Sequence, residues 1–218
     1  MGLLDTIFGR TKPVRANLDA LFSLPAAAVT LQVSAGLVPS GRAGVCFKPP
    51  AGQPFEQVQA ELEQLLRMDD SGSAPSGTDA PGAPGAPGSP VPAAPSVRHV
   101  GDKYGYRWIV VDGGAIDDLV TRVHVVHSSL EDAGWSTQLL CSVFGFTPAG
   151  ATDVEDAVSK PMYLVYLAKR GTFYPFAPTG EEERDNELEL RIRSLVTNDL
   201  PIEGDLSRWF PLWDLPIA

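Results

Sequence analysis

Cysteine is scarce in this sequence, and its spacing excludes the usual cysteine chemistry. The 218 residues contain only two cysteines, Cys46 and Cys141, which are far apart and each lie in an apolar run. Neither belongs to a CxxC motif or to a Cys/His spacing that would hold zinc or form a redox pair. We therefore expect two buried free thiols, a state typical of a reducing compartment.

Long apolar runs and an excess of basic residues are also missing. No run approaches the roughly 18 apolar residues that a membrane-spanning helix needs, and the first residues lack the apolar core and cleavage site of a signal peptide. Lys and Arg total 17 against 27 Asp and Glu, which gives a formal net charge of −10. A nucleic-acid partner requires a basic face, so we expect none. These absences predict a cytoplasmic protein.

Catalytic and metal-binding motifs are lacking as well, since no GxSxG, P-loop or GxGxxG sequence occurs. His124 and His127 form an HxxH pair, but a helical wheel places His127 near the centre of an apolar stripe and His124 at its edge. Asp117 and Asp118 fall in the first turn of the same predicted helix, where the helix dipole favours negative charge. We expect neither pair to be catalytic, and we expect no metal and no cofactor.

One long segment has almost no residues able to form a core. From residue 71 to residue 96 the chain consists almost entirely of Ser, Ala, Gly, Pro and Thr, and Asp79 carries the only charge. Such a composition cannot offset the entropy cost of ordering. The sequence therefore predicts a disordered insertion over 69–100, which separates helices and a hairpin in 1–68 from the main α+β portion in 101–218. Because about 70 residues are marginal for an independent core, we favour one domain whose sheet takes strands from both sides.

Before the insertion, hydrophobic spacing predicts a short helix that begins near Val14 and ends at Pro25. The runs 29–37 and 44–48 are consistent with a β-hairpin around turn residues 39–41, although the first run is alanine-rich and also fits a helix. A second amphipathic helix is predicted from the apolar positions Phe55, Val58, Leu62, Leu65 and Leu66.

After the insertion, alternating apolar residues predict a strand over 104–112, followed by an amphipathic helix over 115–133. Two apolar runs, 136–146 and 162–169, are expected to form an antiparallel pair. Thr179 and Glu182 have capping-box spacing for a last helix that reaches about residue 198. The expected fold is therefore α+β, an antiparallel sheet with packed helices.

Two segments place arginine beside several aromatic rings, with prolines holding the backbone extended: KRGTFYPFAP at 169–178 and RWFPLWD at 208–214. Such rings either close the core of the protein or, with cations at the rim, form a partly exposed groove that grips a partner. Both interpretations remain open at this stage. The candidate partner-binding residues are Lys169, Arg170, Phe173, Tyr174, Phe176, Arg208, Trp209 and Trp213.

The first residues have the layout of an interfacial segment, in which apolar side chains on one helical face precede cations. The same apolar face also suits internal packing against the core, so this second interpretation stays open. The candidate membrane-contact residues are Leu3, Leu4, Ile7, Phe8, Arg10 and Lys12.

Four stretches together resemble the bacterial family of PspA-associated proteins called PspAB: GLLDTIFGRTK, LEDAGWSTQLLCSVFGF, YLVYLAKRGTFYPFAP and DLSRWFPLWD. The resemblance implies a link to the phage-shock response to envelope stress. It also implies a partner, phage shock protein A (PspA), which is a coiled-coil protein that coats stressed membrane from the cytoplasmic side. Some family members neighbour a membrane protease of the HtpX type.

The expected function is therefore that of a non-enzymatic adaptor, which binds PspA or an HtpX-type protease at or near the cytoplasmic face of the membrane. A small-molecule sensor with an aromatic-lined pocket is the first alternative. A hydrolase with an unrecognised site is the second.

Overall fold

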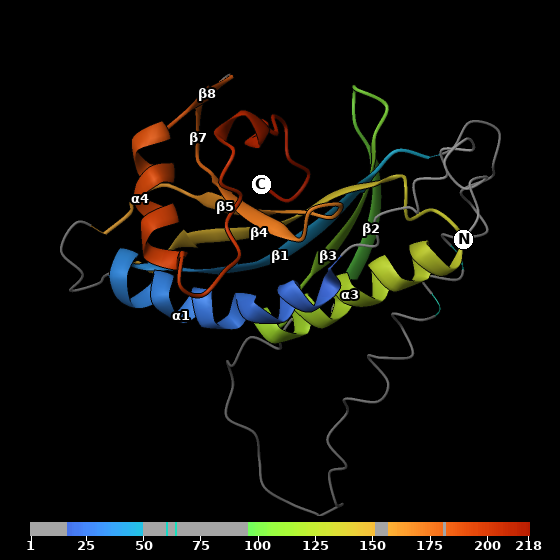
Figure 1. Ribbon diagram of the computed structural model, residues 1–218, viewed down its shortest axis with the longest axis horizontal. Helices are drawn as coiled ribbons and strands as arrows, with labels where there is room; N and C mark the ends of the chain where they lie inside the picture. The colour runs from blue at the N-terminus through green and yellow to red at the C-terminus, as the bar shows by residue number, and fades with distance from the viewer. Residues whose placement is uncertain (1–16, 50–59, 61–63, 65–95, 151–156, 181) are drawn as a thin grey trace, which may run out of the picture.

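The computed structural model describes residues 17–49, 60, 64, 96–150, 157–180 and 182–218 (Figure 1). The predicted membrane-contact residues in 1–12 lie outside these residues, as does most of the predicted insertion. The amphipathic helix predicted over 55–66 also lies outside them, apart from Ala60 and Gln64, which are helical and exposed.

The centre of the fold is an antiparallel six-stranded sheet with the order β2-β3-β1-β4-β5-β6. Strand β1 precedes the predicted insertion but pairs with β3 on one side and β4 on the other, so the sheet takes strands from both sides as expected. The α+β prediction is confirmed. The strands are β1 (Leu37–Phe47), β2 (Ser96–Gly101), β3 (Arg107–Asp112), β4 (Leu139–Pro148), β5 (Met162–Leu167) and β6 (Thr172–Phe176).

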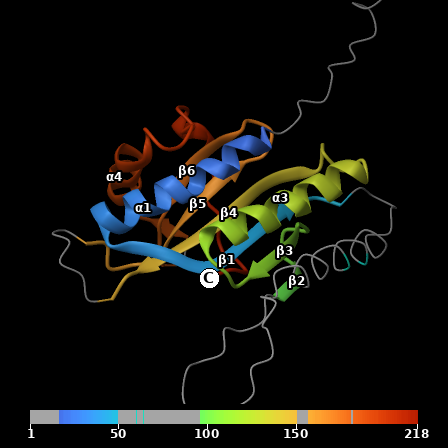
Figure 2. The same ribbon diagram turned by 90° about the horizontal axis from the view of Figure 1, so that it is seen from below.

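Helices cover one face of this sheet. Helix α1 (Leu24–Ala35), which follows the short helix η1 (Leu18–Ser23), lies beside α3 (Ile116–Asp132) across that face (Figure 2). Helix α4 (Asn186–Val196) contacts α1 and β6. The helices and the sheet bury the larger core cluster between them, which includes Leu21, Leu31, Val123, Phe144, Tyr166 and Ile192.

The opposite face is covered by the end of the chain. Residues 201–218, here called the C-terminal segment, lie on the side of the sheet away from α1 and α3 (Figure 1). They contain the short helix η2 (Leu206–Arg208) and complete a second core cluster, which includes Trp108, Val143, Tyr174, Phe176, Trp209 and Ile217. The molecule therefore has three layers, with helices on one side of the sheet and an irregular segment on the other.

The prediction of a β-hairpin over 29–48 is wrong, because this stretch contains the end of α1 and the single strand β1. Residues 29–35 belong to α1, as the alanine-rich alternative allowed, and the predicted end at Pro25 is instead the first turn, where proline is well tolerated. The helix ends at Gly36, whose φ of 64° suits glycine. The expected turn residues 39–41 lie within the single strand β1, at an irregularity in its pairing with β4.

Two other boundaries also differ from the prediction. Helix α4 begins after Asp185, whose carboxylate accepts a hydrogen bond from Leu188 N at 2.9 Å, and not at the predicted Thr179. The residues before it form a small hairpin of β7 (Pro178–Gly180) and β8 (Glu183–Arg184). Residues 96–100, predicted as insertion, belong to β2, because pairing with β3 satisfies their backbone groups.

One helical stretch, Leu18–Ala35, is long and apolar enough to cross a membrane by length and composition alone. This finding differs from the expectation that no such run exists. In the fold, 39% of that stretch is buried, because its inner side packs on the sheet. A core helix passes the same test, so the stretch is weak evidence for a membrane span.

Candidate binding surfaces

The rings of the predicted partner-binding set are mostly interior, whereas its cations Lys169, Arg170 and Arg208 are exposed. Phe173 points into the larger core on the helix side of β6, whereas Tyr174 and Phe176 lie in the second core beneath the C-terminal segment. Trp209 is only 7% exposed, and Trp213 is half-buried. The rings therefore close the core, the first of the two interpretations above, and four of the five cannot contact a partner in this conformation.

Ring contacts attach the C-terminal segment to β6. The Tyr174 and Trp209 rings stack with centroids 6.0 Å apart, and the Tyr174 hydroxyl donates to the Phe210 carbonyl oxygen at 2.8 Å. Phe176 meets Trp213 edge-on at 5.4 Å. Burial raises the pKa of Tyr174, so its hydroxyl remains a donor at neutral pH.

Glu203 anchors the beginning of the segment. Its buried carboxylate pairs with Arg170 and accepts hydrogen bonds from Thr172 Oγ1 at 3.1 Å and Asp205 N at 3.0 Å. Burial alone would raise the pKa of Glu203, but these donors outweigh burial and lower it. The Glu203 backbone carbonyl also accepts from Trp209 Nε1 at 3.0 Å.

Two further arginines of this region also bind within the protein. Arg184 pairs with the buried Glu189 at 2.7 Å and donates to the Trp209 carbonyl at 2.7 Å. Arg208 pairs with its neighbour Asp205 at 3.0 Å. Lys169 is exposed. Sequence reasoning missed the roles of Glu203, Glu189 and Arg184. Their local sequence pattern does not predict contacts between the C-terminal segment and distant residues.

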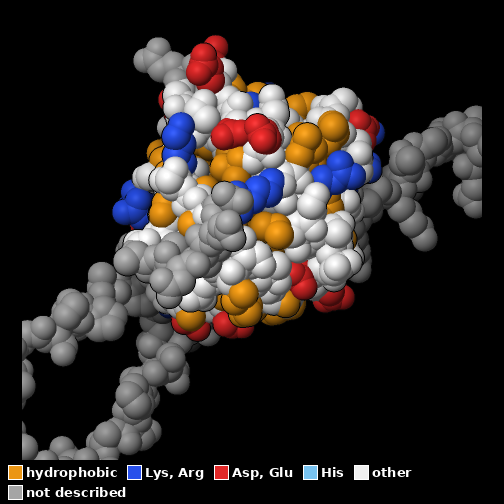
Figure 3. Space-filling view, turned by 90° about the vertical axis from the view of Figure 1, so that its left-hand side faces the viewer, with side chains coloured by type: hydrophobic (Ala, Val, Ile, Leu, Met, Phe, Trp, Pro, Cys, Tyr) orange, Lys and Arg blue, Asp and Glu red, His pale blue; other side chains and the backbone are white. Residues whose placement is uncertain are grey.

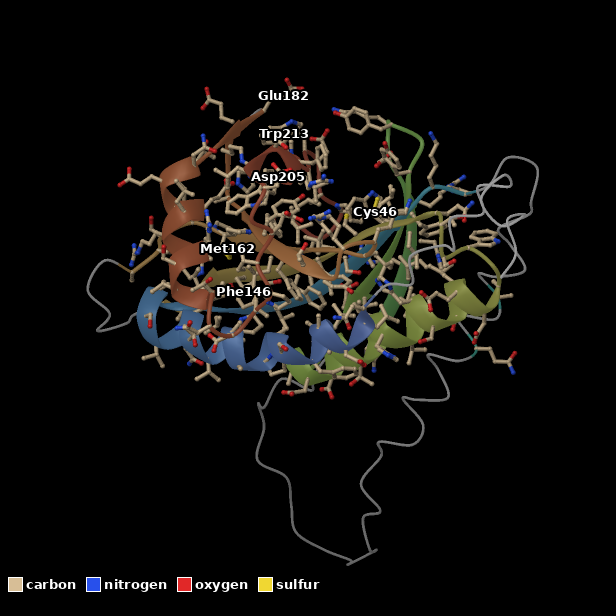
Figure 4. All side chains as sticks on the ribbon, in the orientation of Figure 1. Cys46, Phe146, Met162, Glu182, Asp205 and Trp213 are labelled. Carbon is tan, nitrogen blue, oxygen red and sulfur yellow. The ribbon has the colours of Figure 1, made fainter. Side chains whose placement is uncertain are left out.

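A cavity of about 570 Å³ lies between the sheet and the C-terminal segment. Aromatic side chains from the β2–β3 turn, β3, β6 and the segment line it, among them Tyr104, Trp108, Tyr174, Phe210 and Trp213. Both cysteines line it as well, and Figure 4 shows Cys46 on the side of the sheet that faces Trp213. Such a cavity is the feature that the sensor alternative requires.

The outer face of α1 is the second candidate surface. Phe22 near the end of η1 and Val29 and Val33 on α1 are 53%, 62% and 69% exposed, and Ala26 is exposed between them. These four residues, here called the α1 stripe, are four, three and four positions apart. Hydrophobic side chains reach the surface along the lower edge of Figure 3, the side on which α1 lies. Sequence reasoning missed the stripe because it assigned residues 29–37 to a strand.

The histidines and aspartates match their structural interpretations. His127 is fully buried on α3 with Nε2 2.6 Å from Ser142 Oγ, and burial followed by the charge of His124 lowers its pKa to about 3. His124 is half-buried against the Phe22 ring. Asp118 caps α3 by accepting from Ala115 N at 3.1 Å, and Asp117 is exposed. Among the described residues, no group of three or more His, Cys, Asp or Glu could hold a metal ion.

The architecture and these surfaces define an α+β protein whose own C-terminal segment closes one sheet face while a bare apolar stripe lies on the other side. The chain belongs to the family described as PspA associated protein B (PspAB), whose family model matches residues 1–217. The family description names an association with a protein, not a reaction. No curated protein and no solved structure matches the chain.

Proposed function

We propose that this protein is an adaptor that binds a helical segment of PspA with the α1 stripe. The observation that carries the proposal is a stripe of exposed apolar side chains on a helix whose inner side is already packed. The aromatic rings that the sequence suggested as a partner-binding surface instead hold the C-terminal segment. We therefore assign the partner-binding surface to α1. The proposal rests on the family description for the identity of the partner.

The spacing of the stripe favours a helix as the occupant. Steps of four, three and four residues are those of the a and d positions of a heptad, which form the seam between two packed helices. Ala26, Val29 and Val33 lie on the side of α1 opposite the buried Leu24 and Leu31, and Phe22 precedes them at the end of η1. PspA is the expected partner because the family description names it, and because the family resemblance implies that it is a coiled-coil protein.

Charge favours a protein over a lipid surface. The stretch Leu18–Ala35 contains a single charged residue, Asp19, and no cation. Segments that bind anionic membranes usually combine an apolar face with several Lys or Arg residues. A formal net charge of −10 further opposes adhesion to anionic lipid.

The test is to place a charge in the stripe and, as a matched control, the same charge beside it. Val29→Glu and Val33→Glu should each weaken binding of purified PspA at least tenfold, because a desolvated carboxylate would face an apolar seam. Gln32→Glu adds the same charge on the same helix, about 90° from the stripe, and should bind as the wild type does. Binding is measured by sedimentation velocity, and circular dichroism checks that each variant is folded.

Wild-type affinity of both stripe variants would refute the proposal. Loss of flotation with anionic vesicles in the absence of PspA, by the same two variants, would assign the stripe to lipid instead. Both variants should remain folded, since residues 29 and 33 point to solvent, so both outcomes are measured on folded protein.

We further propose that the protein acts in the cytoplasm, near the inner face of the membrane, with weak membrane contact through its first residues. This rests on the family resemblance and on the apolar positions Leu3, Leu4, Ile7 and Phe8 before Arg10 and Lys12. An HtpX-type protease is a further partner under the same proposal. Equal vesicle flotation with and without residues 2–12 would remove the membrane contact.

A small-molecule sensor is a second candidate, and the aromatic-lined cavity favours it. A ligand in the cavity would raise the melting temperature by mass action. Trp213→Ala should reduce that rise, whereas a sensor role fails if no apolar compound from a screening set shifts the melting temperature.

A further inference from the structure

The two cysteines, which are 95 positions apart in sequence, are direct neighbours in the fold. Cys46 on β1 lies opposite Cys141 on β4, on the two central strands of the sheet. Residues directly opposite each other on antiparallel strands point to the same face, with Cβ atoms about 4.5–5.5 Å apart. A disulfide needs Cβ atoms about 3.5–4.5 Å apart, so a shift of about 1 Å separates the two states.

Two local features make this shift accessible. The pairing of β1 with β4 is irregular between Cys46 and Phe47, immediately beside the pair. Such irregularities interrupt the ladder and let the strand bend locally. Both thiols are free and line the cavity beneath the C-terminal segment, so a small molecule that enters the cavity meets sulfur at its floor.

We propose that Cys46 and Cys141 are a redox modification site, which a hydroperoxide that enters the cavity converts to a reversible disulfide. This pair could not be predicted from sequence patterns, because the two thiols meet only through strand pairing. The proposal is independent of the partner and of the α1 stripe.

The two thiols react as a pair. The adjacent Cys141 sulfur and burial both raise the pKa of Cys46, so its thiol is protonated at neutral pH. One thiol of the pair is the attacking group, and the other is the resolving thiol.

The reaction balances in two steps. One thiol loses its proton and attacks one oxygen of hydrogen peroxide as the thiolate, the O–O bond breaks, and the departing hydroxide takes up that proton to leave as water. The resulting sulfenic acid is attacked by the sulfur of the other cysteine, which forms the S–S bond and releases a second water. Two thiols thus lose two electrons to the peroxide, and a dithiol reductant returns them by exchange.

The direct test uses the folded full-length chain. Reduced protein is treated with hydrogen peroxide, quenched with catalase, denatured and alkylated with N-ethylmaleimide. The expected product has lost two hydrogen atoms, takes up no maleimide, and yields a peptide that contains both Cys46 and Cys141. Two alkylated cysteines after treatment would overturn the proposal, as would a disulfide that forms only between two chains or only in urea.

Serine variants test the resolving step. Cys46→Ser and Cys141→Ser each leave one thiol without its resolving partner, so sulfenic acid should accumulate and be trapped by dimedone in the variants more than in the wild type. Absence of trapping in both folded variants would overturn the reaction with peroxide. The mass measurement on the wild type stands even if a serine variant does not fold.

Discussion

Arginine residues beside aromatic rings here serve the protein's own architecture. Arg170 binds the buried Glu203, and Arg184 binds the buried Glu189 and a backbone carbonyl of the C-terminal segment. Each guanidinium compensates a carboxylate that burial would otherwise destabilise. Arginine beside aromatic rings in the sequence therefore fits a docking groove and an internally bound C-terminal segment equally well. Only the contacts of these residues in the fold distinguish the two.

Glu203→Gln should loosen the C-terminal segment. Loss of the charged acceptor weakens the bonds from Arg170 and Thr172, so the free energy of unfolding should fall by about 2 kcal/mol at neutral pH. Because the folded-state pKa of Glu203 is lowered, its contribution exists above the ordinary glutamate pKa of about 4.3 and disappears as the pH falls through the folded value.

Urea unfolding of the wild type and the variant, at neutral pH and at acid pH, measures this difference. Asp214→Asn is the matched control, since Asp214 pairs with Lys103 at the exposed surface and its loss should be without measurable effect. A Glu203→Gln variant as stable as the wild type at neutral pH would contradict the anchoring role.

His127 should make stability depend on pH in a separate window. Its pKa is about 3 in the folded protein against about 6.5 when unfolded, so only the unfolded chain binds a proton between these values. Stability from the neutral imidazole is present above pH 6.5 and is lost as the pH falls; at pH 5.5 the loss is about 1.4 kcal/mol. His127→Gln should lack this loss in urea titrations at pH 7.5 and 5.5. An equal loss in the variant would contradict the assignment.

At the scale of elements, helices α1 and α3 show why one prediction was wrong and another correct. Its residues are hydrophobic on all sides, so periodicity could not separate helix from strand over 29–37. Pro25 in the first turn and Gly36 after the last are start and stop signals for one helix, and these signals were available in the sequence. By contrast, α3 has one apolar side and was predicted within a residue at each end.

Gly36→Ala tests the stop signal. Gly36 has φ of 64°, a conformation that costs an alanine about 1 kcal/mol. Gly180→Ala is the control, because Gly180 is outside the left-handed region and a methyl group there would meet no atom within 4 Å. Thermal unfolding should show a lower melting temperature for Gly36→Ala only. Equal melting temperatures would show that the α1 cap does not limit stability.

At the scale of the whole molecule, the strand order was beyond the reach of sequence patterns. The antiparallel pair of β4 and β5 follows from two apolar runs that are near in sequence. The insertion of β1 between β3 and β4 depends on packing over about 100 residues, for which no local signal exists. The cavity and the cysteine pair arise from this insertion, so neither was predictable before the fold was known.

The strand order also predicts which part of the β1–β2 connection can be removed. Strands β1 and β2 both run antiparallel to β3 and so are parallel to each other, which means that the connection must return along the length of β2, about 17 Å. Removal of residues 72–94 leaves enough chain for this crossing. The free energy of unfolding should then change by no more than about 0.6 kcal/mol, the cost of a twofold change in loop length.

Removal of residues 50–70 as well should prevent folding. The four residues left in the connection reach at most about 18 Å, whereas the connection must cover the length of β2 and also pass β3, which separates β1 from β2 by about 10 Å. Chemical denaturation of the two deletion variants measures the contrast. Marked destabilisation by the first deletion would show that residues 72–94 contribute to the folded core.

The central position of β1 has a consequence for how the chain acquires its structure during synthesis. This eleven-residue strand leaves the ribosome early, yet both of its neighbours are encoded more than 50 residues later. The backbone N–H and C=O groups along both edges of β1 therefore remain unpaired until β3 and β4 are synthesised. Contacts between residues so far apart in sequence slow folding. The nascent protein should depend on chaperones until β4 is made, and ribosome-bound chains stopped before residue 148 should be sensitive to protease throughout β1.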